Sequence, residues 1–181
     1  MNPRLIDAPA LCRRDLLKFS VGATVLLAGV GLGASLSGCS PGQPASGLTT
    51  LRDSDLPFLR AVIPVMLDGA VAGEHIRDAT QATLRSLDNG LAHLSPSMLK
   101  LTRQLFDLFK LSVIRGPLTG IWGAWENASA EDIRRFFDRW ENSSLNLLRQ
   151  GHSSLLQMVM MAWYGRPQAW AHCGYPGPPA V

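Results

Sequence analysis

The sequence predicts an all-α protein, a small bundle of about five helices followed by an extended tail rich in aromatic residues, proline and glycine. Apolar residues recur at intervals of three and four from Asp53 onward, which is the period of an amphipathic helix. Serines stand at positions suited to helix capping, with Ser95 before a proline and Ser129 before two acidic residues. No pair of alternating segments predicts strands, and no internal repeat is present.

Residues 1–38 are expected to be an export signal and not part of the fold. Arg13 and Arg14 come shortly before a lysine and an uncharged, glycine-rich segment that extends to residue 38. Positive charge, then an apolar segment, then small residues is the order found in signal peptides. The paired arginine and the low hydropathy of the segment resemble a twin-arginine (Tat) signal more than a Sec signal. The sequence therefore predicts export by the Tat translocase to the periplasm.

Cys39 is the expected site of lipid attachment. The segment Leu36-Ser37-Gly38-Cys39 matches a lipobox at all four positions, where the cysteine thiol takes a diacylglyceryl group and becomes the new N-terminus. Such processing attaches more than one acyl chain, which stable membrane anchoring requires. Two alternatives stay open. Ordinary cleavage could occur nearby, or the segment could be retained as an anchor, since about 18 apolar residues nearly span a bilayer.

The remaining residues are enough for one domain, with a flexible tether over residues 39–52 and a helical domain over residues 53–181. The leader holds four basic and two acidic residues, so the net charge of +3 falls to about +1 without it. There is no basic patch with interleaved aromatic residues, so nothing predicts a nucleic-acid partner. If Cys39 carries lipid, Cys173 has no disulfide partner within the chain.

Two helices are predicted in the first half of the domain. The first begins after Asp53 or Ser54, and Pro64 is expected to kink or end it. The second runs from about Gly73 to Gly90. Their expected inward residues are Leu56, Leu59, Ile63 and Met66 in the first, and Ile76, Ala79, Thr83 and Leu87 in the second.

Three longer helices are predicted in the second half. The helix after Ser95 reaches about Ile114, carries more than one apolar stripe and is expected to be the central, most buried helix. Gly116-Pro117 is expected to break it, and a short further helix is possible over 118–125. Another helix runs from Ser129 to about Gln150, where Gly151 is expected to stop it. The last clear helix covers His152 to Tyr164.

The segment 163–179 is expected to leave the helical pattern, because glycine and proline interrupt it. It is also too aromatic for a disordered tail. Two interpretations stay open: a tail folded back over its own helices, or a strip that docks a partner through tryptophan and tyrosine side chains.

The chain lacks recognisable catalytic or metal-binding motifs. Its four histidines are far apart, and none has a second histidine or cysteine at the spacing of metal ligands. There is no nucleophile elbow, phosphate loop, dinucleotide fingerprint or haem attachment site. Because Tat carries folded proteins, and often proteins with cofactors, a passenger without a cofactor site suggests that it carries a cofactor-containing partner across the membrane. An independent periplasmic lipoprotein and an enzyme with an unrecognised site remain alternatives.

Both ends of the domain resemble a known family. The segment from Met161 to Trp170, with Met-Ala-Trp-Tyr-Gly-Arg-Pro-Gln-Ala-Trp, and the following Gly-Tyr-Pro-Gly-Pro to Pro178 resemble the closing motif of the gluconate 2-dehydrogenase subunit 3 family. Leu59-Arg-Ala-Val-Ile-Pro64 resembles the first helix of that family. Its members are small subunits of membrane-associated, FAD-dependent sugar or alcohol dehydrogenases, and a Tat leader is typical of them.

The resemblance implies a non-catalytic subunit that helps a large flavoprotein of the glucose-methanol-choline (GMC) type to mature and to cross the membrane. FAD would lie in that partner, and a cytochrome c subunit is a further partner in some complexes. By match to the closing motif, the residues implied at the interface are Trp163, Tyr164, Trp170, Tyr175 and Pro176. The lipobox is a departure, since many relatives lack an evident one.

Overall fold

The structure, a computed structural model, describes residues 42–177 apart from the side chains of Ala171 and His172. This part of the chain contains seven α-helices, three short 3₁₀ helices and no strand, so the predicted all-α bundle is confirmed. The α-helices are α2 (Leu56–Met66), α3 (Ile76–Ala92), α4 (Pro96–Lys110), α5 (Ser112–Thr119), α6 (Ala130–Glu141), α7 (Asn146–Tyr164) and α8 (Pro167–Cys173). The 3₁₀ helices η1 (Asp53–Asp55), η2 (Gly73–His75) and η3 (Trp125–Asn127) precede α2, α3 and α6.

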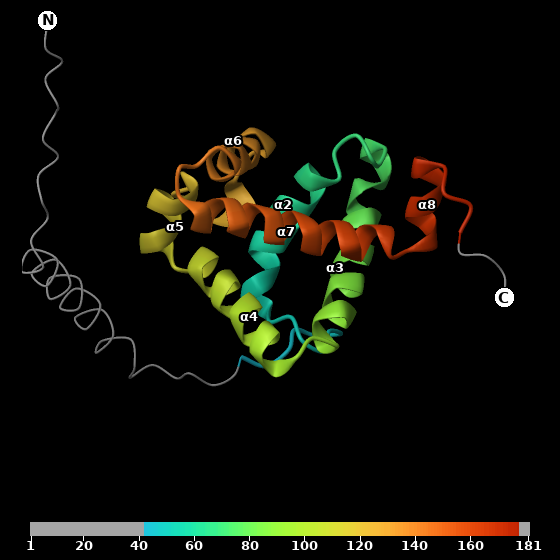
Figure 1. Cartoon of the computed structure of the whole chain (residues 1–181), viewed down its shortest axis with the longest axis horizontal. Coiled ribbons are helices and arrows are strands. Elements are labelled where there is room, and N and C mark those ends of the chain that lie inside the picture. Colours follow the sequence, from blue (N-terminus) through green and yellow to red (C-terminus); the bar gives the residue numbers. More distant parts are fainter. Residues whose placement is uncertain (1–41, 178–181) are drawn as a thin grey trace, which may run out of the picture. The chain divides into compact units, whose positions relative to one another are not determined.

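Helix α2 lies at the centre of the bundle. It contacts α3, α6, α7 and η3, and Figure 1 shows α7 crossing it, with α3 to one side and α6 to the other. Leu59, Val62 and Ile63 of α2 have no exposed surface, and the helix ends at Met66, just after Pro64 as expected. The prediction that the helix after Ser95 would be the most buried is wrong. Of its residues, α4 buries only two phenylalanines.

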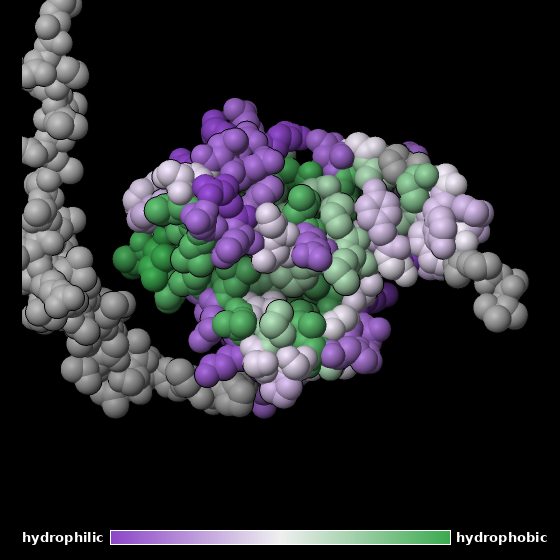
Figure 2. All heavy atoms as spheres, viewed as in Figure 1, coloured by the Kyte–Doolittle hydropathy of each residue, from purple (hydrophilic) through white to green (hydrophobic). Residues whose placement is uncertain are grey.

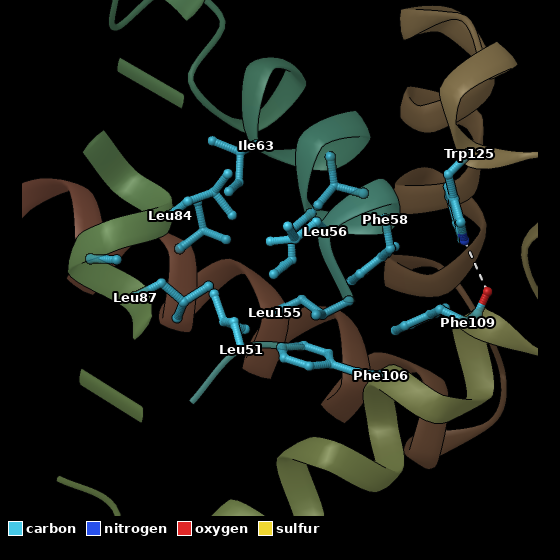
Figure 3. Close-up of a cluster of buried hydrophobic side chains, with 14 of the residues drawn as sticks. Leu51, Leu56, Phe58, Ile63, Leu84, Leu87, Phe106, Phe109, Trp125 and Leu155 are labelled. Carbon is cyan, nitrogen blue, oxygen red and sulfur yellow. Dashed lines mark hydrogen bonds between the residues drawn. The ribbon is translucent and has the colours of Figure 1, made fainter. Parts of the chain in front are cut away.

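An aromatic cluster joins α2, α4, η3 and α6, and Figure 3 shows its members Phe58, Phe106, Phe109 and Trp125. The Phe109 ring of α4 stacks on Phe58 of α2, with ring centroids 4.2 Å apart. Trp125 packs edge-on against Phe58 at 4.9 Å, and Phe136 packs edge-on against Trp140 at 5.0 Å. Rings at these distances and tilts contribute about 0.5–1.5 kcal/mol per pair beyond the area that they bury.

Two tryptophans of this cluster also donate hydrogen bonds to the ends of helices. Trp125 Nε1 donates to the Phe109 carbonyl at 2.9 Å, near the end of α4. Trp140 Nε1 donates to the Leu118 carbonyl at 2.8 Å, near the end of α5. The last carbonyls of a helix have no partner within it, so a buried indole N–H stabilises the helix end and is itself satisfied.

The predicted boundary between the third helix and the segment after it is wrong. The chain leaves the helical conformation at Leu111, where ψ is 106°, and then starts α5, which passes through Gly116 and Pro117. Pro117 has no N–H, so it cannot donate to the carbonyl of Val113 four residues before it. Val113 is exposed, and water can donate to that carbonyl instead. Helix α5 ends instead at Gly120, whose φ of +84° favours glycine.

Gly151 does not end a helix as predicted but lies inside α7. The chain turns earlier, between Glu141 and Asn146. A Cβ atom at Gly151 would lie 2.5 Å from Trp140 Cζ3. The glycine therefore lets α7 approach the Trp140 ring of α6.

The segment predicted as a flexible tether is folded onto the domain from Pro44 to Arg52. Pro44 and Arg52 form an isolated bridge, and the Ala45 N–H donates to the Leu51 carbonyl at 2.8 Å. The side chains of Ala45 and Leu51 are buried in the core. A Pro/Gly/Ser-rich composition suggested a linker, but buried apolar side chains and a hydrogen-bonded anchor on α3 hold this part in place.

That anchor is Asp88, a buried carboxylate on α3. Its oxygens accept hydrogen bonds from the backbone N–H groups of Thr49, Thr50 and Leu51 at 2.7–2.8 Å, and from the Thr49 hydroxyl at 2.9 Å. Burial acts to raise the pKa of Asp88. The backbone hydrogen bonds from Leu51, Thr49 and Thr50 outweigh burial and hold that pKa below its ordinary value. We call Asp88 and residues 49–51 the Asp88 clamp.

Replacing Gly151 with alanine should destabilise the domain, although alanine is the better helix former by about 1 kcal/mol. The added methyl group would press on the Trp140 ring, and overpacking of this kind costs about 1–3 kcal/mol. The matched control is Gly90→Ala in α3, where no atom lies within 4 Å of the added Cβ, so the variant should be slightly stabilised. Urea unfolding should give a lower free energy of unfolding for Gly151→Ala and a slightly higher one for Gly90→Ala. Equal changes in the two variants would contradict the packing role of Gly151.

Replacing Asp88 with asparagine should lower the free energy of unfolding by about 2 kcal/mol at pH 7, because an amide cannot accept all four hydrogen bonds. The pKa of Asp88 is lowered in the folded state. Its contribution is therefore fully present above the unfolded value of about 3.9 and is lost as the pH falls through the folded value. The difference in free energy of unfolding between the wild type and Asp88→Asn should therefore shrink as the pH falls from about 3.9 through the folded pKa, and urea unfolding from pH 7 downward measures it. Asp138→Asn, at an exposed position in α6, is the control and should change stability by less than about 0.5 kcal/mol at every pH.

Candidate docking surface

A groove of about 650 Å³ lies between α3, α4 and α7. Its apolar lining consists of Leu87 and Leu91 from α3, Leu94 from the connection, Met98, Leu101 and Leu105 from α4, and Met158, Met161 and Ala162 from α7. Figure 2 shows hydrophobic side chains gathered in the region between α4 and α7. We call this feature the α4–α7 groove.

The groove follows from the two apolar stripes of α4. One stripe, with Phe106 and Phe109, enters the core. The other, with Met98, Leu101 and Leu105 at spacings of three and four, lines the groove. The sequence already contained both stripes. The prediction took them to mean a fully buried helix, whereas in the structure only one stripe is buried and the other lines the groove.

The α4 and α7 sides of the lining include well-exposed apolar residues, whereas Leu87 and Leu91 of α3 are buried at its base. Leu101 is 59% exposed and Met161 is 68% exposed. Exposed apolar patches with polar rims are typical of sites that bind proteins or small apolar ligands. Methionine side chains are flexible and polarisable, which suits them to irregular partner surfaces.

The lining of the groove is uncharged. Its polar lining residues are Ser86, Asn89, Thr102, Ser154 and Gln157, and no ionisable side chain lines it. A hydroxyl needs a neighbouring base to act as a nucleophile, and no base is present in the lining. The arrangement is suited to binding an apolar surface.

Within residues 42–177, no group of three histidine, cysteine, aspartate or glutamate side chains is placed to hold a metal ion. His75 and His93 are exposed, and His152 packs near the Phe137 ring at 5.9 Å. None of the helices in this part of the chain has both the length and the apolar character needed to cross a bilayer.

The structure brings together only some of the residues that the closing motif implies. Trp163 is buried in the core, and its Nε1 has no hydrogen-bond partner among the described residues. Tyr164 is more than one-third exposed. Trp170 and Tyr175 form an edge-on pair with centroids 5.4 Å apart, and Pro176 next to them is exposed. Trp163 therefore contributes to stability, whereas the other four residues lie at or near the surface.

The prediction that helical structure ends at Tyr164 is wrong, because α8 follows after a turn at Gly165. Pro167 occupies the first position of α8, where the N–H that it lacks would be unpaired in any case. Trp170 Nε1 donates to the Tyr164 carbonyl at 2.9 Å, so a third indole binds the end of a helix. The exposed Cys173, a free thiol, ends α8. The last described residues fold back on α8, since Tyr175 N donates to the Trp170 carbonyl at 3.0 Å.

Arg13, Arg14 and Cys39, the residues of the predicted export signal and lipid attachment, lie outside the described residues. The groove residues were not predicted as a site. The signal that could have found them is the surplus of apolar residues on α4, together with the methionine-rich sequence of α7.

No protein-family model, curated protein or solved structure matches this chain. The resemblance to dehydrogenase small subunits therefore depends on the motifs at the two ends of the domain.

Proposed function

We propose that this chain is the non-catalytic small subunit of a periplasmic, membrane-associated FAD dehydrogenase of the GMC type. In this role it binds the large flavoprotein, assists its maturation and supplies the Tat signal for export of the pair. A lipid at Cys39 would anchor the complex to the membrane. The flavin and the catalytic residues belong to the partner, and a cytochrome c subunit is a possible third component.

The observation that carries the binding role is the α4–α7 groove. It exposes apolar side chains of α4 and α7, and no ionisable residue lines it. The proposed partner class has separate support, from the closing motif between Met161 and Pro178 and from the paired arginine of the leader. The exposed Tyr175 and the half-buried Trp170 add side chains of the kind that dominate the energetics of protein interfaces.

A second candidate is an independent periplasmic lipoprotein that binds a small apolar ligand. The groove volume of about 650 Å³ favours it, because pockets for small ligands fall within about 300–1,000 Å³. The two candidates differ in what fills the groove, a protein segment in the first and a small molecule in the second.

Affinity purification of the full chain from the membranes of its own bacterium tests the proposal. A yellow eluate with flavin absorption bands and a co-purifying large chain is expected. The variant Leu101→Asp should lose the flavoprotein, because it places a charge in the groove. Lys100→Asp is the matched control: it is the neighbouring residue on α4, exposed and outside the groove lining, and should retain the partner.

The outcome against the proposal is a colourless eluate that contains this chain alone, under conditions shown to preserve another membrane complex. If both Leu101→Asp and Lys100→Asp retain the flavoprotein, the groove is not part of the interface. Leu101 is largely exposed, so its substitution should leave the free energy of unfolding within about 0.5 kcal/mol of the wild type.

Replacing Arg13 and Arg14 with lysine should leave both this chain and its flavoprotein in the cytoplasm, because the partner would depend on the signal of this chain. Cell fractionation with immunoblotting and periplasmic dehydrogenase activity measures both proteins. If only this chain stays in the cytoplasm while the flavoprotein reaches the periplasm, the carrier role is contradicted.

A further inference from the structure

A second apolar surface lies around α5, and it shares no residue with the α4–α7 groove. It consists of Leu111, Val113, Ile114 and Trp122, which we call the α5 surface. Val113 is 84% exposed and Trp122 is 73% exposed, and Figure 2 shows hydrophobic side chains at the left edge of the domain, over α5. Exposed apolar patches are typical of surfaces that bind proteins or membranes.

Val113 and Trp122 lie side by side on the α5 surface. Val113 is three residues before Gly116, so both lie on the same side of α5. The Trp122 ring covers that side, since a Cβ atom at Gly116 would lie 2.5 Å from Trp122 Cε3. The ring has one face on the helix, and most of its surface is exposed to solvent. An aromatic side chain that is held in this way loses little conformational entropy when it is covered.

The centre of the α5 surface offers no accessible charge. From residue 111 to residue 122 the only charged residue is Arg115. Its side chain is 8% exposed and lies over the buried ring of Trp125, so it is turned towards the core. A polar partner would find no charge to pair with here, whereas the acyl chains of a bilayer need none.

Basic side chains lie at the edge of the α5 surface. Lys110 is exposed directly before it, and the guanidinium of Arg139, an exposed residue of α6, lies beside Gly120 at the end of α5. Of the acidic residues nearest along the chain, Asp107 is already in an ion pair and Glu126 is exposed. An apolar centre with basic groups at its edge suits a lipid surface, because long basic side chains can keep their charge among the headgroups.

The point at which the chain enters the domain is connected to the α5 surface by a short series of contacts. Pro44 forms a bridge with Arg52, and Arg52 Nη2 pairs with Asp107 Oδ1 at 2.8 Å. Asp107 lies in the last turn of α4, four residues before Leu111. The first residues that are folded onto the domain are therefore near the edge of the α5 surface.

The chain between the expected lipid and the domain is short. Cys39 is five residues before Pro44. Five residues span at most about 18 Å even when fully extended, so a lipid at Cys39 would keep the bundle at the membrane surface. A surface that is tethered so close to the headgroups meets them at a high effective concentration, and a modest apolar contact is then enough to hold it there.

We propose that the α5 surface lies in the headgroup region of the lipid bilayer. The side chains of Leu111, Val113 and Trp122 enter the boundary between headgroups and acyl chains, and Lys110 and Arg139 remain among the lipid phosphates. This contact is a second attachment besides the lipid, and it fixes which face of the bundle is turned to the membrane. The proposal rests on the lipid of the proposed function and does not depend on the identity of the protein partner.

Fluorescence quenching of the lipidated protein in vesicles tests the proposal. The full-length chain with Val113→Cys and Cys173→Ser is expressed, purified from membranes in detergent and labelled with nitrobenzoxadiazole at residue 113. It is then reconstituted into vesicles of phosphatidylethanolamine and phosphatidylglycerol. Gln81→Cys in place of Val113→Cys is the matched control, because Gln81 is an exposed residue of α3. Mass spectrometry of the purified protein measures whether Cys39 carries lipid.

A nitroxide on the acyl chains of the vesicle lipid should quench the label at residue 113 and leave the label at residue 81 unchanged. Iodide in the surrounding buffer should do the reverse. Trp122→Ala should weaken the contact with the bilayer about tenfold and lower the lipid quenching at residue 113. Leu101→Ser, at an exposed residue of the α4–α7 groove, should leave that quenching unchanged.

Three outcomes would overturn the proposal. Quenching at residue 113 by iodide, in protein that carries the lipid, would place the α5 surface in water while the anchor stays intact. Protection of residue 113 from both quenchers would mean that a protein covers the surface. Absence of lipid at Cys39 would contradict the proposal and the anchoring part of the proposed function together, whereas the role as a flavoprotein subunit would still be decided by the affinity purification.

Discussion

Most of this bundle depends on the double role of two buried tryptophans, Trp125 and Trp140. Trp125 and Trp140 each bury a large apolar ring in the cluster around Phe109, and each gives its single polar hydrogen to a carbonyl at a helix end. Burial of the ring and satisfaction of the N–H thus occur in one contact. The ends of α4 and α5 are fixed by the same residues that fix the packing of α6 against the core.

This arrangement explains why apolar residues remain on the surface. Because Trp125 binds the end of α4 and the chain turns at Leu111, α5 leaves the direction of α4. The residues just after the turn then lie outside the core, although their composition is that of a core helix. The second stripe of α4 stays uncovered for a similar reason, since only its Phe106 and Phe109 stripe faces α2 and η3. The two exposed surfaces follow from the geometry of the core and not from a shortage of apolar partners.

The sequence predicted the helix starts better than the helix ends. Ser95 and Ser129 both cap as expected, because a serine cap is a local interaction between neighbouring residues. The glycines were misread, since Gly116 and Gly151 each make room for a tryptophan ring from outside their own helix, and the periodicity within a helix contains no information on such contacts. The all-α class follows from periodicity alone, as do the inward positions of Ala79, Thr83 and Leu87 in α3, whereas Ile76 is only partly buried. Predicting the groove would have required knowing which stripe of α4 the other helices cover.

The Asp88 clamp has a mechanical consequence. The chain ahead of the bundle joins α3 through Thr49, Thr50 and Leu51 before it enters η1 and α2. Tension applied from the N-terminal side would load several parallel hydrogen bonds on one carboxylate at once, so they would have to break together. The force would reach α3 first, and the central helix α2 would bear it only after the clamp had opened. A pull on the N-terminal side would thus meet the clamp and α3 before it reached the central helix α2.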